Sequence, residues 1–111
     1  MATVTPKALL DGTLLANSIA TLYVVPAAMS AVVRSITLCN TDSVDHAVTL
    51  HFVPFAGSPS GATMILNALP IKAGQTIEDD LLRVLGTGGS IRAFADAANA
   101  VSMRVDGSEV T

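Results

Sequence analysis

The strongest constraint on how this chain folds is an alternation of apolar with polar or small residues. The alternation has a period of two and recurs in residues 34–39, 47–53, 90–96 and 101–106. Successive side chains of a β-strand point to opposite faces, whereas side chains on one face of an α-helix recur about every 3.6 residues. The pattern therefore predicts half-buried antiparallel strands, each with one face in the core.

Turn-forming residues separate these segments at intervals of roughly ten residues, a spacing typical of sandwiches and barrels. We therefore expect an all-β fold: a single antiparallel β-sandwich, jelly-roll or Greek-key like, with about eight short strands. The expected strands cover residues 7–10, 21–25, 32–39, 47–53, 63–66, 76–80, 90–95 and 100–105.

Three segments are less regular. Residues 26–30 and 95–100 fit brief helices, and residues 81–85 fit either a strand or a helical turn. No internal repeat or linker divides the 111 residues. We expect a short extended N-terminal arm over residues 1–6 and one sandwich domain over residues 7–111, long enough to bury roughly two-thirds of its unfolded surface.

The polarity of the chain is unusual for a small domain. Hydrophobic residues make up 50% of it and charged residues only 14%, against about 25% charged in typical domains. Small domains have much surface for their volume, and few charges are available here to cover it. Exposed apolar surface commonly marks a protein–protein interface, so we expect a homo-oligomer or another assembly.

Charge and hydropathy argue against several other classes. The six Lys and Arg residues are scattered in a chain of net charge −3, whereas binding to a phosphate backbone needs clustered cations. No apolar stretch reaches the roughly 20 residues that cross a bilayer, and the N-terminus lacks a signal peptide's basic and apolar regions. We expect a product made in the cytoplasm that binds neither nucleic acid nor membrane.

No residue pattern suggests catalysis, a cofactor or a metal. His46 and His51 are an odd number of residues apart, so a strand directs them to opposite faces, and both are expected at the surface or an interface. The carboxylates of residues 78–80 are expected to form a solvated strand edge, which discourages unwanted pairing. Cys39 is expected to be a buried, inert thiol. The chain is therefore predicted not to be an enzyme.

The scarce aromatic residues are the best candidates for contact with a partner. Phe55 follows Pro54 where a strand ends, and Phe94 is the next candidate, whereas Phe52 lies on an apolar strand face and is expected in the core. The Gly-, Ser- and Pro-rich loop of residues 57–61 and the arm add further candidates. The predicted interface residues are Phe55, Phe94, Pro59, Met1 and Val4.

Four segments together resemble the small β-sandwich structural proteins in virions of tailed bacteriophages. They are Thr21-Leu22-Tyr23-Val24-Val25-Pro26-Ala27, residues 31–40, Ser90-Ile91-Arg92-Ala93-Phe94-Ala95 and residues 101–110. The likeness is one of strands and turns and contains no catalytic signature. It implies a non-enzymatic virion component whose partners are the major capsid protein or other virion proteins.

Within that class the sequence favours a capsid decoration (cement) protein, because the chain is nearly all sandwich and has no long shaft. Such a protein would stabilise the shell by packing between capsid subunits. The alternative in the same class is a tail, baseplate or fibre component involved in host attachment. The alternative from another class is a carbohydrate-binding module, for which exposed aromatic rings such as Phe55 and Phe94 would be needed.

Overall fold

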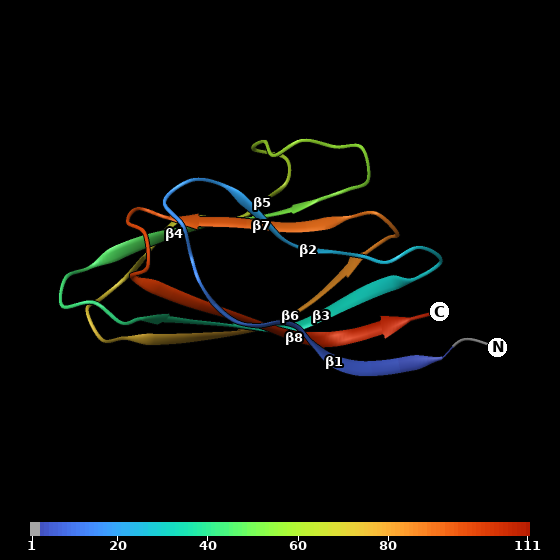
Figure 1. The fold of residues 1–111 in the computed structure, drawn as a ribbon, viewed down its shortest axis with the longest axis horizontal. Coiled ribbons are helices and arrows are strands. Elements are labelled where there is room, and N and C mark those ends of the chain that lie inside the picture. The colour runs from blue at the N-terminus through green and yellow to red at the C-terminus, as the bar shows by residue number, and fades with distance from the viewer. Residues whose placement is uncertain (1–2) are drawn as a thin grey trace.

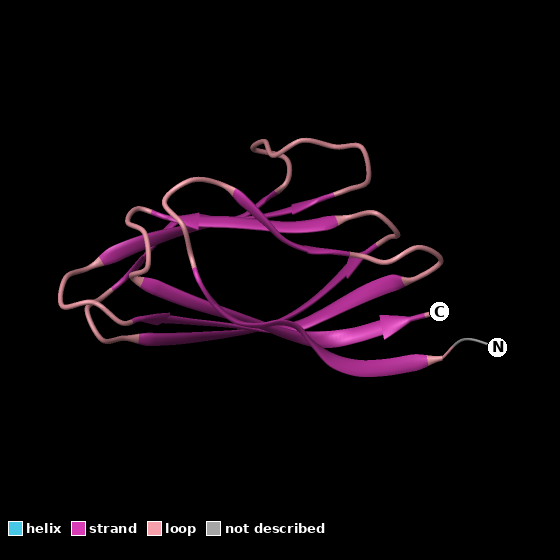
Figure 2. Ribbon diagram, in the orientation of Figure 1, coloured by secondary structure: helices cyan, strands magenta, loops and turns pink. Residues whose placement is uncertain are grey.

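The computed structural model describes residues 3–111, apart from the side chain of Leu81. Strands and loops make up all of this part of the chain, and no helix occurs in it (Figure 2). The eight strands are β1 (Val4–Leu14), β2 (Ala20–Val24), β3 (Ser30–Asn40), β4 (His46–Val53), β5 (Met64–Ile71), β6 (Thr76–Leu85), β7 (Ser90–Ala95) and β8 (Val101–Val110).

The strands form two four-stranded antiparallel sheets that face each other (Figure 1). One sheet has the order β1-β8-β3-β6 and the other the order β2-β7-β4-β5. Most neighbours within a sheet are distant in sequence, so the chain crosses repeatedly between the sheets, as in a jelly roll of two Greek keys. The expected all-β sandwich is confirmed.

The core lies between the sheets and consists of small aliphatic side chains. In residues 91–95 of β7 and 101–105 of β8 every second residue is buried, as the alternation predicts, and Phe52 belongs to the same core. The fully buried side chains include Ile36, Leu38, Leu50, Ile71, Ile91, Met103, Val33, Val48 and Val101. A sandwich filled in this way is thin, and the molecule measures 49 × 26 × 19 Å.

Strand β4 departs from the expected alternation, because both of its faces are buried. Val53 is fully buried although it lies on the face opposite Leu50 and Phe52. The reason is the connection from β4 to β5, residues 54–63, which folds back over the outer side of its own sheet (Figure 1). The Phe52 amide donates to the Thr63 carbonyl oxygen at 3.0 Å and fixes this loop against the strand.

Several expected boundaries need correction. Residues 26–30 and 95–100 contain turns rather than brief helices, and residues 81–85 continue strand β6. Most strands are also longer than expected. β1 and β8 bend through irregular pairs and stay paired from Val4↔Val110 to Leu14↔Ser102, although the Asp-Gly pairs at 11–12 and 106–107 locally favour turns.

The expected N-terminal arm lies partly inside a sheet. Residues 4–6 begin β1 and pair with β8, and the Thr111 amide donates to the Thr3 carbonyl oxygen at 3.0 Å. Strand β1 runs through residue 6 without a break, so the chain described from residue 3 onward enters the sandwich directly. Met1, a predicted interface residue, lies outside the described residues.

Candidate interaction surface

The described residues enclose no pocket, and none of their His, Cys, Asp and Glu side chains gather in a group able to hold a metal ion. No helix in residues 3–111 is long and apolar enough to cross a membrane. The candidate functional features of the described residues are therefore small clusters of polar side chains and the exposed surface. Two polar clusters and one surface stand out.

The first cluster is centred on His46, which the sequence predicted at the surface or an interface. His46 is the first residue of β4 and is buried. Its Nδ1 lies 2.6 Å from Asp96 Oδ1 and its Nε2 lies 2.8 Å from Asp42 Oδ2. The ring thus joins the β3–β4 loop to the β7–β8 loop.

Both imidazole nitrogens of His46 face carboxylates, and only the doubly protonated ring can donate to both. The hydrogen bond to Asp42, followed by that to Asp96, raises the pKa of His46. The same hydrogen bond lowers the pKa of Asp42. Because both ring nitrogens are engaged by carboxylates from two different loops, this cluster serves as a clamp between the loops.

The second cluster bridges the two sheets. Tyr23 of β2 donates its hydroxyl to Glu109 of β8, and Lys7 Nζ of β1 lies 3.2 Å from the other carboxylate oxygen. Burial, then the hydrogen bond and charge of Glu109, raise the pKa of Tyr23. The Tyr23 hydrogen bond and Lys7 lower the pKa of Glu109. This contact fixes the strand ends near both termini.

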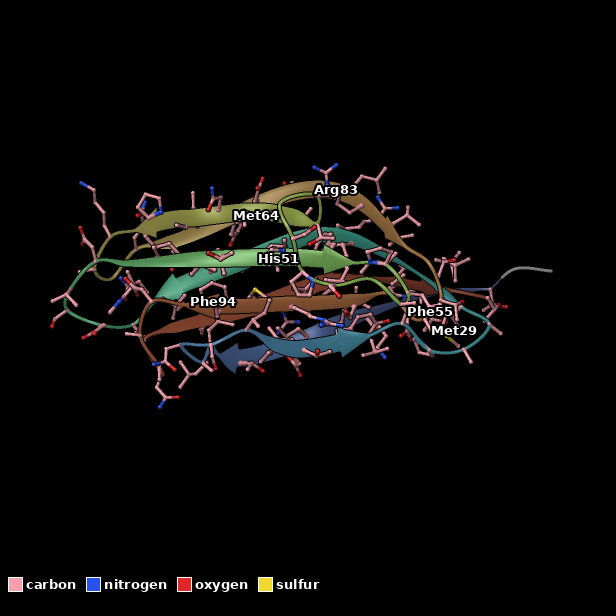
Figure 3. The ribbon with its side chains drawn as sticks, turned by 90° about the horizontal axis from the view of Figure 1, so that it is seen from above. Met29, His51, Phe55, Met64, Arg83 and Phe94 are labelled. Carbon is pink, nitrogen blue, oxygen red and sulfur yellow. The ribbon has the colours of Figure 1, made fainter. Side chains whose placement is uncertain are left out.

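The other histidine is also buried, which corrects the expectation that His51 lies on an outer surface. His51 does point to the outer side of its sheet, but the 54–63 loop covers that side. Its Nδ1 lies 2.8 Å from Thr63 Oγ1, and Figure 3 shows it in the middle of the sheet. Cys39, expected in the core, is half-buried on the opposite side of β3 from Leu38.

The most distinctive surface is the end of the sandwich that carries the termini. Three loops meet there: residues 25–29, 54–63 and 86–89. None of the three contains Asp, Glu, Lys or Arg, and we call this the charge-free end. The opposite end carries Asp42, Asp45, Lys72 and Asp96 in its loops. The few charges of the chain are therefore unevenly distributed along its long axis.

Backbone hydrogen bonds hold the loops of the charge-free end together. The Gly88 amide donates to the Val25 carbonyl oxygen at 3.1 Å, and the Val25 amide donates to the Gly89 carbonyl oxygen at 2.8 Å. The Thr87 hydroxyl donates to the carbonyl oxygen of Met29. The end is thus a built surface on which side chains have defined positions.

Phe55 is the most exposed large hydrophobic residue of the described chain, with 75% of its surface accessible. Its ring rests on Gly88, where an added Cβ would overlap the ring and the positive φ of 79° disfavours any side chain. Figure 3 places Phe55 beside Met29 at one end of the molecule. The sequence predicted Phe55 as a contact residue, and the structure places it at the tip of the charge-free end.

The other predicted interface residues lie in different places. Val4 is 60% exposed at the start of β1, near the charge-free end. Pro59 is partly exposed within the 54–63 loop. Phe94 is half-buried on the outer side of β7, opposite Thr49 and well away from Phe55 (Figure 3). The structure does not bring the two aromatic rings together.

Sequence reasoning missed three exposed apolar residues in this half of the molecule. Val24 ends β2, and Leu82 and Val84 lie near the end of β6; they are 53%, 65% and 66% exposed. The signal available was the apolar residues at positions 81, 82, 84 and 85, which break the period of two. These residues belong to β6, which lies at the edge of its sheet. The pairing of β6 with β3 shifts by one residue between Asp80 and Arg83, so the alternation is broken there.

No family model and no curated protein matches the chain. Among solved structures, a protein of Bacillus endospore appendages, described as disulfide-linked pili, is similar with a TM-score of 0.53 and 13% identity over 99% of this chain and 88% of the other. A chain of the infectious bursal disease virus particle gives a TM-score of 0.52 and 12% identity over 98% of this chain and 30% of the other. The VP2 subviral particle of that virus gives 0.50 and 11%, over 98% and 32%.

At these identities the likeness shows a common sandwich fold. The chain spans about a third of the viral chains and most of the appendage chain.

Proposed function

We propose that this chain is a non-enzymatic structural protein of a virion, a capsid decoration (cement) protein that stabilises the shell by packing between capsid subunits. The observation that carries the proposal is the charge-free end, with Phe55 75% exposed at its tip. Loops that carry no Asp, Glu, Lys or Arg to desolvate, together with a fixed aromatic ring, are suited to burial against another protein.

The fold supports this role in general terms. The structural neighbours include capsid-particle and pilus proteins, so sandwiches of this kind serve as building blocks of large assemblies. The resemblance of the strand and turn pattern to tailed-phage virion proteins adds the specific setting. In this proposal the charge-free end contacts the shell, and the opposite end, with Asp42, Asp45 and Asp96 in its loops, faces solvent.

The direct test compares particles of the phage that carries this chain, with and without it. Decoration predicts that particles lacking the chain lose resistance to heat or pressure and that added protein restores it. Particles that remain robust but no longer adsorb to cells would instead support a tail, baseplate or fibre component. The pilus-like neighbour, which is matched over 88% of its length, favours this second candidate over a carbohydrate module.

The surface itself is tested with single substitutions. Phe55→Ala removes the exposed ring, and we expect binding to the shell to weaken by roughly 30-fold, corresponding to a hot spot of about 2 kcal/mol. Val44→Ala is the matched control, because Val44 is 55% exposed at the opposite end. Equal binding by both variants would refute the charge-free end as the contact. Glycan binding that disappears with Phe55→Ala or Phe94→Ala would support the carbohydrate module.

A further inference from the structure

We propose that the open edge of β6 pairs with the same edge of a second copy of this chain, in one antiparallel register centred on residue 81. This inference rests on the structural role proposed above and names a contact between copies within it. Such pairing extends a sheet across a two-fold axis by backbone hydrogen bonds, while side chains select the register.

Strand β6 is the sheet edge most open to such pairing. It is the last strand of its sheet and is ten residues long. Among the described strands it pairs with β3 alone, through a ladder with one irregularity between Asp80 and Arg83. The other edge strands are less suited to it: β1 contains Pro6, β5 contains Pro70 and β2 has five residues. Proline removes a backbone donor, and short edges offer few hydrogen bonds.

The charges of β6 lie on one side of the strand and are well separated. Asp79 is paired with Ile36, and Arg83 with Val33. Both β3 partners are buried, so Asp79 and Arg83 share the side of the sheet that faces the opposite layer. Both are nevertheless exposed, because β6 is at the rim, and Figure 3 shows Arg83 at the long side of the molecule.

Neither charge takes part in an ion pair among the residues that the structure describes. The ion pairs formed by the described residues involve Lys7, His46 and Arg104 with their partners, and neither Asp79 nor Arg83. When two copies of an antiparallel strand meet about a two-fold axis, residues equally distant from the centre face each other. With residue 81 at the centre, Asp79 faces Arg83 of the second copy, and this ion pair forms twice.

The same register also matches apolar residues on that side of the strand. Ile77 and Leu85 lie opposite Leu38 and Ala31 of β3, which are buried. Both are four residues from position 81, so Ile77 of one copy faces Leu85 of the other. The order of apolar, acidic, basic and apolar residues is therefore self-complementary.

Other registers are disfavoured by the charges. Centres at 79, 80 or 83 place two identical charges directly opposite each other, which is destabilising in a sheet. A centre at 82 leaves Asp79 and Arg83 without an oppositely charged partner. Charged residues on an edge normally discourage pairing, and here their order permits one arrangement and rejects its neighbours.

The test is a charge-reversal cycle on the full-length chain, read out by sedimentation equilibrium. The dimer should dissociate at least about tenfold more readily in Asp79→Arg and in Arg83→Asp, because each change creates two like-charge contacts. The double variant restores both ion pairs in reverse and should return to within about threefold of wild type. Glu78→Arg is the control, since it alters the charge of the same strand but faces Val84.

A wild-type chain that stays monomeric at every concentration would overturn the inference. Single variants that dimerise like wild type, or a double variant as weak as either single one, would do the same. Amide exchange adds a second readout: residues 76–85 should exchange more slowly as the dimer forms, whereas residues 4–14 should not change. Binding to shells is measured separately, so a chain that dimerises in this pattern without binding shells would refute only the decoration role.

Discussion

Gly107 offers a sharp test of the sheet that carries the termini. It lies in the middle of β8, paired with Lys7 of β1 on one side and with Val33 of β3 on the other. A Cβ added there would overlap the Val32 carbonyl oxygen and lie 3.0 Å from the carbonyl carbon. The obstacle is backbone, which cannot rotate away, so Gly107→Ala must push β3 and β8 apart.

The expected cost follows from that geometry. Overpacking a well-packed region costs about 1–3 kcal/mol, and separating the strands weakens ladder hydrogen bonds worth roughly 0.5–1.5 kcal/mol each. We expect Gly107→Ala to lower the free energy of unfolding by about 3 kcal/mol and the Tm by roughly 12 °C. Gly61→Ala is the matched control, because nothing lies within 4 Å of its added Cβ.

Thermal unfolding followed by circular dichroism measures both variants, and the control should stay within about 0.5 kcal/mol of wild type. A Gly107→Ala protein that unfolds at the wild-type temperature would show that β3 and β8 do not approach as described.

Three further outcomes are expected. The pKa of His46 is raised above its usual 6.5, so the protonated ring stabilises the fold fully below pH 6.5 and this stabilisation is lost as the pH rises through the raised value. His46→Gln should therefore make the free energy of unfolding fall less steeply as the pH rises in this range. Tyr23 is the one tyrosine, so tyrosinate absorbance reports it alone: it should stay protonated above the usual pKa of 10.0, and Glu109→Gln should lower its pKa. Leu50 is fully buried, and Leu50→Ala should cost about 2–5 kcal/mol in chemical denaturation, whereas Val44→Ala should cost little.

The architecture could be predicted from the sequence because its signals are local. The alternation in residues 90–95 and 101–105 records which side chains face the core, and turn residues record where strands end. The strand order could not be predicted, since it depends on pairings between distant residues. Strand lengths were underestimated for the same reason: β1 and β8 continue through positions that locally favour turns because each is held by a paired neighbour.

The surroundings of the two histidines were hidden for a different reason. His51 is on the outer side of its strand, as its odd position implies, and is buried only because residues 54–63 fold back over it. His46 is bonded to Asp96, fifty residues away. Neither contact can be predicted from the alternation of residues along a strand. Phe55 was different, because a large apolar residue directly after a strand-ending proline is exposed by its local position alone.

The distribution of charge links the two proposed contacts. The loops of the charge-free end lack Asp, Glu, Lys and Arg, and the exposed residues Val4, Val24 and Val84 lie in the strands next to it. The antiparallel pairing proposed for the β6 edge reverses the second copy, so the charge-free ends of the two copies point in opposite directions along the strands. In such a pair one charge-free end would attach to a shell and the β6 edge would hold the second copy. Disrupting the β6 edge should therefore lower the number of copies on a shell without weakening the attachment of the seated copy.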